Sequence, residues 1–164
     1  MTDYLISQFQ TMSEGMKYLM TFLISMLPIV ELRGAVPIGV ALGLNTYLVL
    51  LISIIGNMVP IPFVIIFARA IINWLKKKKF LAWFGRWLEK KAAKNVEKVI
   101  KYEKIGLFIF VAIPLPGTGA WTGALIASLF DLRLKNSILP IAWGVALAGV
   151  IMTLGSEGIK LLIT

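Results

Sequence analysis

The sequence predicts an all-α integral membrane protein, an inverted repeat of two re-entrant helical hairpins and two spanning helices, with amphipathic helices at the membrane interface. Three observations predict this fold class. The chain is 59% hydrophobic, its mean hydropathy is +0.86, and a segment rich in glycine and proline interrupts an apolar stretch in each half. Paired interruptions of this kind indicate broken helices around a midplane site, since hydrocarbon does not tolerate exposed irregular backbone.

Composition also excludes several kinds of functional site. Only 15% of the residues are charged, whereas soluble domains have about 25%. The chain has no Cys and no His, which excludes disulfides, thiolate or imidazole metal sites and nucleophilic triads that use histidine. We therefore expect no enzyme, no cofactor and no metal site. The N-terminal segment lacks a basic start and is not typical of a cleaved signal peptide.

The net charge of +9 is concentrated in residues 76–104, which contain 11 of the 17 Lys and Arg residues but only 3 of the 8 acids. In a soluble protein such a patch suggests nucleic-acid binding. Here it directly follows an apolar segment, which is the positive-inside pattern. We expect this linker to be cytoplasmic, both chain ends to be outside and no nucleic-acid partner.

The chain is expected to form one membrane domain over residues 1–164, with a first repeat at 1–75, the basic linker at 76–104 and a second repeat at 105–164. Two apolar segments are long enough to span a bilayer, and four are short enough to be the arms of re-entrant hairpins. The predicted spans are 46–75 and 136–155, and the arms are 18–30, 35–44, 105–113 and 120–130.

Small residues spaced four apart in both outgoing arms support the repeat. Residues 35, 39 and 43 in the first arm and 119, 123 and 127 in the second are all Gly or Ala, an offset of 84. Such stripes let helices approach closely in lipid. In the first span, Pro60 and Pro62 follow Asn57 and predict a kink. Residues 80–102 show amphipathic periodicity and predict a helix on the inner leaflet.

Glu31 and Arg33, in the Gly/Pro-rich segment at residues 28–39, are the strongest functional candidates. A charge at the bilayer centre costs about 2.5–3.5 kcal/mol on insertion scales, so charged groups there face a cavity, form pairs or take part in function. A purely structural role, with Glu31 satisfying Arg33 and free hairpin amides, is the alternative. Arg69 lies about two turns from the lysine cluster and is expected to have a structural role. Asp131, Arg133 and Lys135 are expected to be interfacial anchors or a phosphate site.

After each hairpin tip the chain is expected to re-enter a helix, near Ala35 and near Ala120, with both N-termini pointing toward the midplane. Free N–H groups and the positive dipole end favour anions there. Glu31 is a candidate proton carrier, because burial raises a carboxylate pKa. The predicted substrate site consists of Glu31, Arg33, Gly34, Pro37, Asn57, Pro116, Gly117, Thr118, Gly119 and Thr122.

The two motifs PIVELRGAVPIG (residues 28–39) and PLPGTGAWTG (residues 114–123) resemble those of the small multidrug export proteins. That family is in turn similar to the DedA and VTT membrane proteins, which implies opposed re-entrant hairpins and a role in lipid flipping or scrambling. By this likeness Glu31 matches the hairpin acid, and Pro116 and Gly117 match the second hairpin. The arginines that DedA proteins carry beside this Pro-Gly pair are missing here.

The leading hypothesis is a multi-pass cell-membrane protein that acts as a secondary transporter or flippase for a small amphipathic or lipid-linked anion. Protons are the expected coupling ion and a homodimer the expected assembly. The expected partners are the lipid bilayer and an amphipathic molecule or lipid phosphate. Two alternatives remain: an exporter of cationic drugs that bind ionised Glu31, and a membrane scaffold that organises lipid without transporting it.

Overall fold

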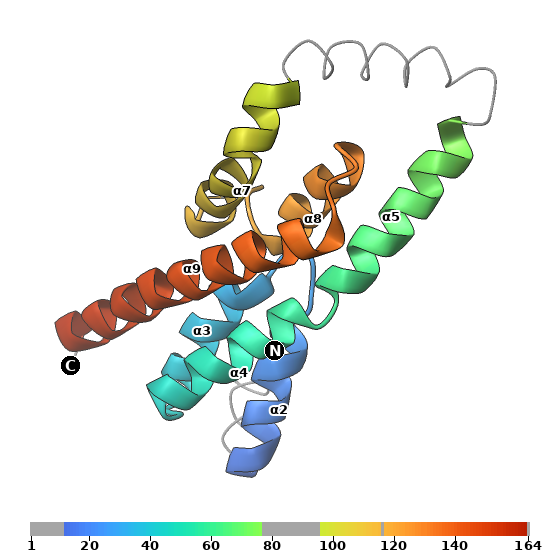
Figure 1. Ribbon diagram of the computed structural model, residues 1–164. Helices are drawn as coiled ribbons and strands as arrows, with labels where there is room; N and C mark the ends of the chain where they lie inside the picture. Colours follow the sequence, from blue (N-terminus) through green and yellow to red (C-terminus); the bar gives the residue numbers. More distant parts are fainter. Residues whose placement is uncertain (1–11, 77–95, 116, 164) are drawn as a thin grey trace. The chain divides into compact units, whose positions relative to one another are not determined.

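The structure is a computed structural model, and it describes residues 12–76, 96–115 and 117–163. These residues form helices and turns with no strand, as the all-α prediction requires. The described helices (Figure 1) are α2 (Glu14–Ser25), α3 (Glu31–Ala41), α4 (Thr46–Met58), α5 (Ile61–Lys76), α7 (Val96–Ala112), α8 (Ala120–Leu129) and α9 (Leu134–Ile163).

Two segments are long and apolar enough to cross a membrane, Thr46–Ile71 and Leu134–Leu162. They agree with the two predicted spans, although the second is longer than expected because α9 runs without a break past residue 155. The helix is interrupted where the kink is predicted: α4 ends at Met58 and α5 begins at Ile61. Pro60 has no N–H to continue the helix, which explains the interruption.

The chain divides into two compact units, each with one helical hairpin and part of each long apolar segment. The first unit comprises residues 1–59 and 145–164, and the second comprises residues 60–144. The hairpin of the first unit is α2 and α3, and that of the second is α7 and α8. Each unit therefore has its own packed core.

In the first unit, α2, α3 and α4 pack on one another in all three pairs. Glycine makes this possible, since a Cβ on Gly39 would lie 2.7 Å from a Val49 methyl, and one on Gly56 would lie 2.7 Å from the Phe22 carbonyl oxygen. Thr46 at the start of α4 donates a hydrogen bond from Oγ1 to the Glu157 carboxylate in α9. The core side chains between these helices are fully or almost fully buried: Leu32, Ala35, Val36 and Val49.

In the second unit, α8 packs on α5 and α7. A Cβ on Gly123 would lie 2.7 Å from a Val111 methyl, and one on Gly144 would lie 2.9 Å from the Phe108 carbonyl oxygen. The buried Ser128 hydroxyl donates to the Ala124 carbonyl at 2.8 Å and lies 3.1 Å from the Ile65 carbonyl. The close contacts in this unit again depend on residues without a large side chain.

The C-terminal ends of α3 and α8 have the same local structure. Each ends in a residue with a left-handed backbone, Gly43 (φ 74°) and Asp131 (φ 52°), which are 88 positions apart. The next residue donates back into the helix, from Leu44 N to Gly39 O at 3.2 Å and from Leu132 N to Ala127 O at 2.9 Å. This is the Schellman arrangement, which satisfies the last carbonyls of a helix.

The burial pattern follows the same offset. Buried positions along α3 are 31, 32, 35, 36, 39 and 40, and those at the start and along α8 are 119, 120, 123, 124, 127 and 128. The helix ends match at an offset of 88, one helical turn away from the offset of 84 predicted from the small residues. The small residues repeat every four positions, so the pattern matches equally well when one helix is shifted by one turn. The sequence alone therefore does not decide between offsets of 84 and 88.

Two predicted boundaries need correction. The helix after the first tip begins at Glu31 and not near Ala35, so Glu31 and Arg33 lie in its first turn. The helix after the second tip begins at Ala120, as predicted. Residues 96–112 form one helix, α7, so the predicted boundary between linker and arm at residues 104 and 105 is not a helix boundary. Most of the predicted amphipathic helix at 80–102 lies outside the described residues.

A prediction on helix packing follows from these contacts. Gly39→Leu and Gly123→Leu should each destabilise the protein by about 1–3 kcal/mol, because the new side chain enters a space that valine methyls already fill. Gly155→Leu is the control, since a Cβ there meets nothing within 4 Å. Melting temperatures in detergent measure the effect. Equal melting temperatures for Gly39→Leu, Gly123→Leu and the control would show that these contacts do not hold the helices together.

Candidate functional site

Glu31 lies at the tip of the first hairpin, directly after the turn that joins α2 to α3. Its side chain is 5% exposed, and its backbone has a φ of 51°. The Glu31 N–H donates to the Leu27 carbonyl at 2.9 Å. A left-handed backbone at a non-glycine residue costs about 1–3 kcal/mol and persists where the surrounding structure enforces it, often at functional sites. The fold therefore holds an acid in a strained, buried position.

The packing of α3 against α4 places Glu31 level with Asn57. The two helices are antiparallel neighbours joined by a short turn, and Gly39 packs against Val49. Residues four apart lie on one face of a helix. One helical turn from the contact between Gly39 and Val49, Ala35 of α3 is level with Ser53 of α4. One turn further along, Glu31 is level with Asn57. Glu31 and Asn57 were both predicted as site residues, and the structure brings them into one unit.

Asn57 and Ser53 are fully buried. Neither the Asn57 amide oxygen and nitrogen nor the Ser53 hydroxyl has a hydrogen-bond partner in the described part of the chain. Leaving a buried polar group unsatisfied costs about 1–3 kcal/mol. These unsatisfied polar groups are level with the buried acid Glu31. This combination favours a site that receives a proton, an ion or a polar ligand group.

Ser25, at the end of α2, contributes a polar side chain from a third helix to this group of buried polar residues. Its side chain is buried, its hydroxyl donates to the Phe22 carbonyl at 2.6 Å, and it lies where a Cβ on Gly56 would be. Gly56 precedes Asn57, so α2 and α4 are in close contact beside the candidate site. We call Ser25, Glu31, Ser53 and Asn57 the polar layer of the first unit.

The other predicted residues of α3 lie along the same helix. Arg33 is half-buried, and the negative charge of Glu31 attracts its guanidinium group. Gly34 lies in the first turn, and its N–H donates to the Val30 carbonyl at 3.0 Å. Pro37 is inside the helix and lines a cavity further along it.

This cavity has a volume of about 660 Å³ and is mainly apolar. It lies between the second half of α3 and the last turns of α9, within the first unit. Lys160 is the ionisable residue among those that line it, and Ser156 adds a hydroxyl. An apolar cavity with one cation fits the tail and head of an amphipathic anion better than it fits a cationic drug.

The predicted residues of the second tip lie in the second unit, and their convergence with the first tip stays a prediction. Gly117 (φ 82°) and Gly119 (φ 143°) have backbones that L side chains rarely adopt. The Thr118 hydroxyl lies 2.7 Å from the Ile113 carbonyl and 2.8 Å from the Leu115 carbonyl, so it belongs to the turn itself. Thr122 is half-buried in α8, and Pro116 lies outside the described residues.

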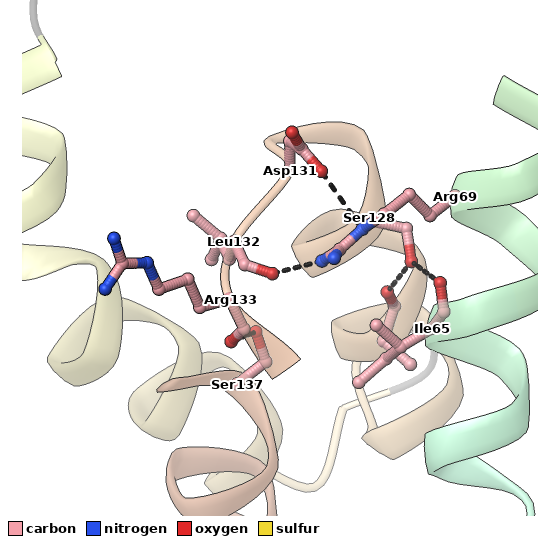
Figure 2. Close-up of polar contacts among 8 residues, drawn as sticks. Ile65, Arg69, Ser128, Asp131, Leu132, Arg133 and Ser137 are labelled. Carbon is pink, nitrogen blue, oxygen red and sulfur yellow. Dashed lines mark hydrogen bonds and ion pairs between the residues drawn. The ribbon is translucent and has the colours of Figure 1, made fainter. Parts of the chain in front are cut away.

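Arg69 has the structural role that the sequence predicts. Its Nε lies 3.0 Å from an Asp131 carboxylate oxygen, and its Nη2 donates to the Leu132 carbonyl. Figure 2 shows that these contacts join α5 to the turn after α8, while the Arg133 side chain extends away from them. Asp131 is thus a partner of Arg69, and a role as phosphate ligand does not suit it.

Sequence reasoning missed Ser25 and Ser53. Ser53 precedes Asn57 by one helical turn in an apolar span, and that spacing is a usable signal. Ser25 is on another helix, and only the packing of Gly56 brings it near. The pattern of small residues alone does not show which helix they contact.

The chain matches the model of a known protein family. A family model described as "Putative small multi-drug export protein" matches residues 31–151. This range includes Glu31, Arg33, Asn57 and the second tip. No curated protein matches the chain, and no solved structure matches it.

Proposed function

Because the chain belongs to the small multi-drug export family, we propose that it is a secondary transporter or flippase for a small amphipathic or lipid-linked anion. Glu31 carries the coupled proton, and Arg33 holds the anionic group. The two hairpins are re-entrant and form an inverted repeat in the cell membrane. The matching ends of α3 and α8, 88 positions apart, support this repeat.

The observation that carries the proposal is the buried, strained Glu31 in a layer of buried polar groups. Among the members of the polar layer, the Glu31 carboxyl group is the one that binds and releases a proton. When the site opens to one side of the membrane, water reaches the acid and the proton leaves. Alternating exposure of one buried acid therefore couples proton movement to a conformational change.

The apolar cavity of the first unit supports an amphipathic substrate. It lies along the same helix as Glu31 and Arg33, and Lys160 gives it a positive charge. A lipophilic cation, the competing substrate class, would bind to ionised Glu31 and would be repelled by Lys160. Charge complementarity thus favours the anion.

Flux into proteoliposomes tests this proposal, with dodecyl phosphate as the amphipathic anion and tetraphenylphosphonium as the lipophilic cation. We expect saturable uptake of dodecyl phosphate that depends on the pH gradient, and no saturable uptake of the cation. Saturable uptake of the cation alone would favour the drug exporter. Lack of saturable uptake of either probe would favour the scaffold.

A prediction for Arg33 follows from its proposed role. Arg33→Ala should weaken binding of dodecyl phosphate, because hydrogen bonds to a charged group contribute about 1.5–3 kcal/mol, or roughly tenfold to 150-fold in affinity. Arg33→Lys should recover only part of this affinity, since the planar guanidinium is lost. Equilibrium binding to the purified protein measures both. Lys17→Ala, on α2, is the control. Unchanged affinity in a well-folded Arg33→Ala would remove Arg33 from the site.

A further inference from the structure

A second cavity lies in the second unit, between α7 and the beginning of α9. Its volume is about 510 Å³. Lys104 from α7 and Lys135 and Asn136 from α9 provide its polar groups. The cavity is separate from the polar layer of the first unit, and none of its residues belongs to the predicted substrate site.

The charge of this cavity is positive. Lys104 and Lys135 come from two different helices and line one space, and no acid is among the described residues that line it. Lys135 also lies in the first turn of α9, where the positive end of the helix dipole favours anions. Lys104 also belongs to the basic linker at residues 76–104, where the positive charge of the sequence is concentrated.

Apolar side chains form the remaining wall. Phe108, Leu139 and Trp143 line the cavity, and Leu139 and Trp143 are 63% and 67% exposed. Large apolar side chains this exposed on a membrane-spanning helix face the lipid chains. The cavity therefore has two ammonium groups at one end and an apolar wall that continues onto the lipid-facing surface.

We propose that this cavity binds an anionic phospholipid from the membrane leaflet that contacts the basic linker. The phosphate lies between Lys104 and Lys135, and an acyl chain lies along Leu139 and Trp143. Basic pockets between membrane helices on the cytoplasmic side commonly recognise anionic headgroups. The site does not depend on the proposed transport function, because it uses other residues and another unit.

The test is a titration of phosphatidylglycerol and phosphatidylcholine into the purified full-length chain, with bound lipid counted by native mass spectrometry. We expect preferential retention of phosphatidylglycerol by the wild type. Lys104→Gln and Lys135→Gln should each weaken it about fivefold, and the double variant roughly 25-fold, from the usual contribution of a surface lysine. Lys17→Gln, on α2, is the control and should bind like the wild type, because Lys17 lines neither cavity.

Two results would overturn this site. One is equal retention of the two lipids by the wild type, or retention of phosphatidylglycerol by the double variant at wild-type affinity. The other is full displacement of the lipid by millimolar inorganic phosphate, which would mean that the cavity binds free phosphate. Fluorescence tests the chain position: brominated phosphatidylglycerol should quench the wild type more than Trp143→Phe, and equal fractional quenching would contradict the placement.

Discussion

Glu31→Gln should fold and bind substrate like the wild type but lose flux driven by a pH gradient. The neutral amide has nearly the shape of a protonated carboxyl group, so the polar layer keeps its packing while the proton site is removed. The expected loss is complete for the proton-driven component. Uptake of dodecyl phosphate into proteoliposomes, with and without a pH gradient, measures it.

The purely structural role predicts a different outcome for this variant. If Glu31 only satisfies Arg33 and the hairpin amides, removal of one charged partner from a buried pair destabilises the protein by about 3–5 kcal/mol. Glu31→Gln would then melt far below the wild type, and Arg33→Ala would do the same. Glu14→Gln is the matched control, because Glu14 is an exposed acid in the first turn of α2. A stable Glu31→Gln with full pH-driven flux would reject both roles.

Gly56→Ala and Gly144→Ala should both destabilise the protein strongly. A Cβ on Gly56 would lie 2.1 Å from Ser25 Oγ and 2.7 Å from the Phe22 carbonyl oxygen, and one on Gly144 would lie 2.9 Å from the Phe108 carbonyl oxygen. Side chains can rotate away, but a helix backbone moves only as a unit. We expect a loss of about 3 kcal/mol for each, at the upper end of the range for overpacking.

These two glycines are 88 positions apart, as are Gly43 and Asp131, so similar losses would also support the repeat. Gly158→Ala is the control, because a Cβ there meets nothing within 4 Å. Thermal melting of the purified variants measures the loss. A melting temperature for Gly56→Ala equal to that of the control would contradict the close approach of α2 and α4.

The sequence predicted the all-helical architecture, the two apolar spans and the interruption at Pro60, because each depends on local composition or on one proline. It did not predict that α3 begins at Glu31. Gly34 and Pro37 have a low helix propensity, so the sequence predicted that the helix begins only near Ala35. In the structure, burial of one face of α3 against α2 and α4 outweighs this local preference.

The candidate site was predicted in part for a similar reason. A charged or amide side chain in an apolar stretch is visible in the sequence, so Glu31, Arg33 and Asn57 were among the predicted site residues. The contacts of Ser25 and Ser53 depend on which turn of one helix meets which turn of another. Arg69 and Asp131 form an ion pair across 62 positions of sequence, and no local pattern reveals such a pair.

Proton coupling through Glu31 can be followed as the pH inside proteoliposomes while dodecyl phosphate is taken up. A trapped pH-sensitive dye reports proton movement, and the variant for comparison is Glu31→Gln. The account predicts a change of internal pH that saturates with the dodecyl phosphate concentration in the wild type and is absent in Glu31→Gln. Saturable uptake by the wild type with no change of internal pH, or an unaltered pH change in Glu31→Gln, would contradict it.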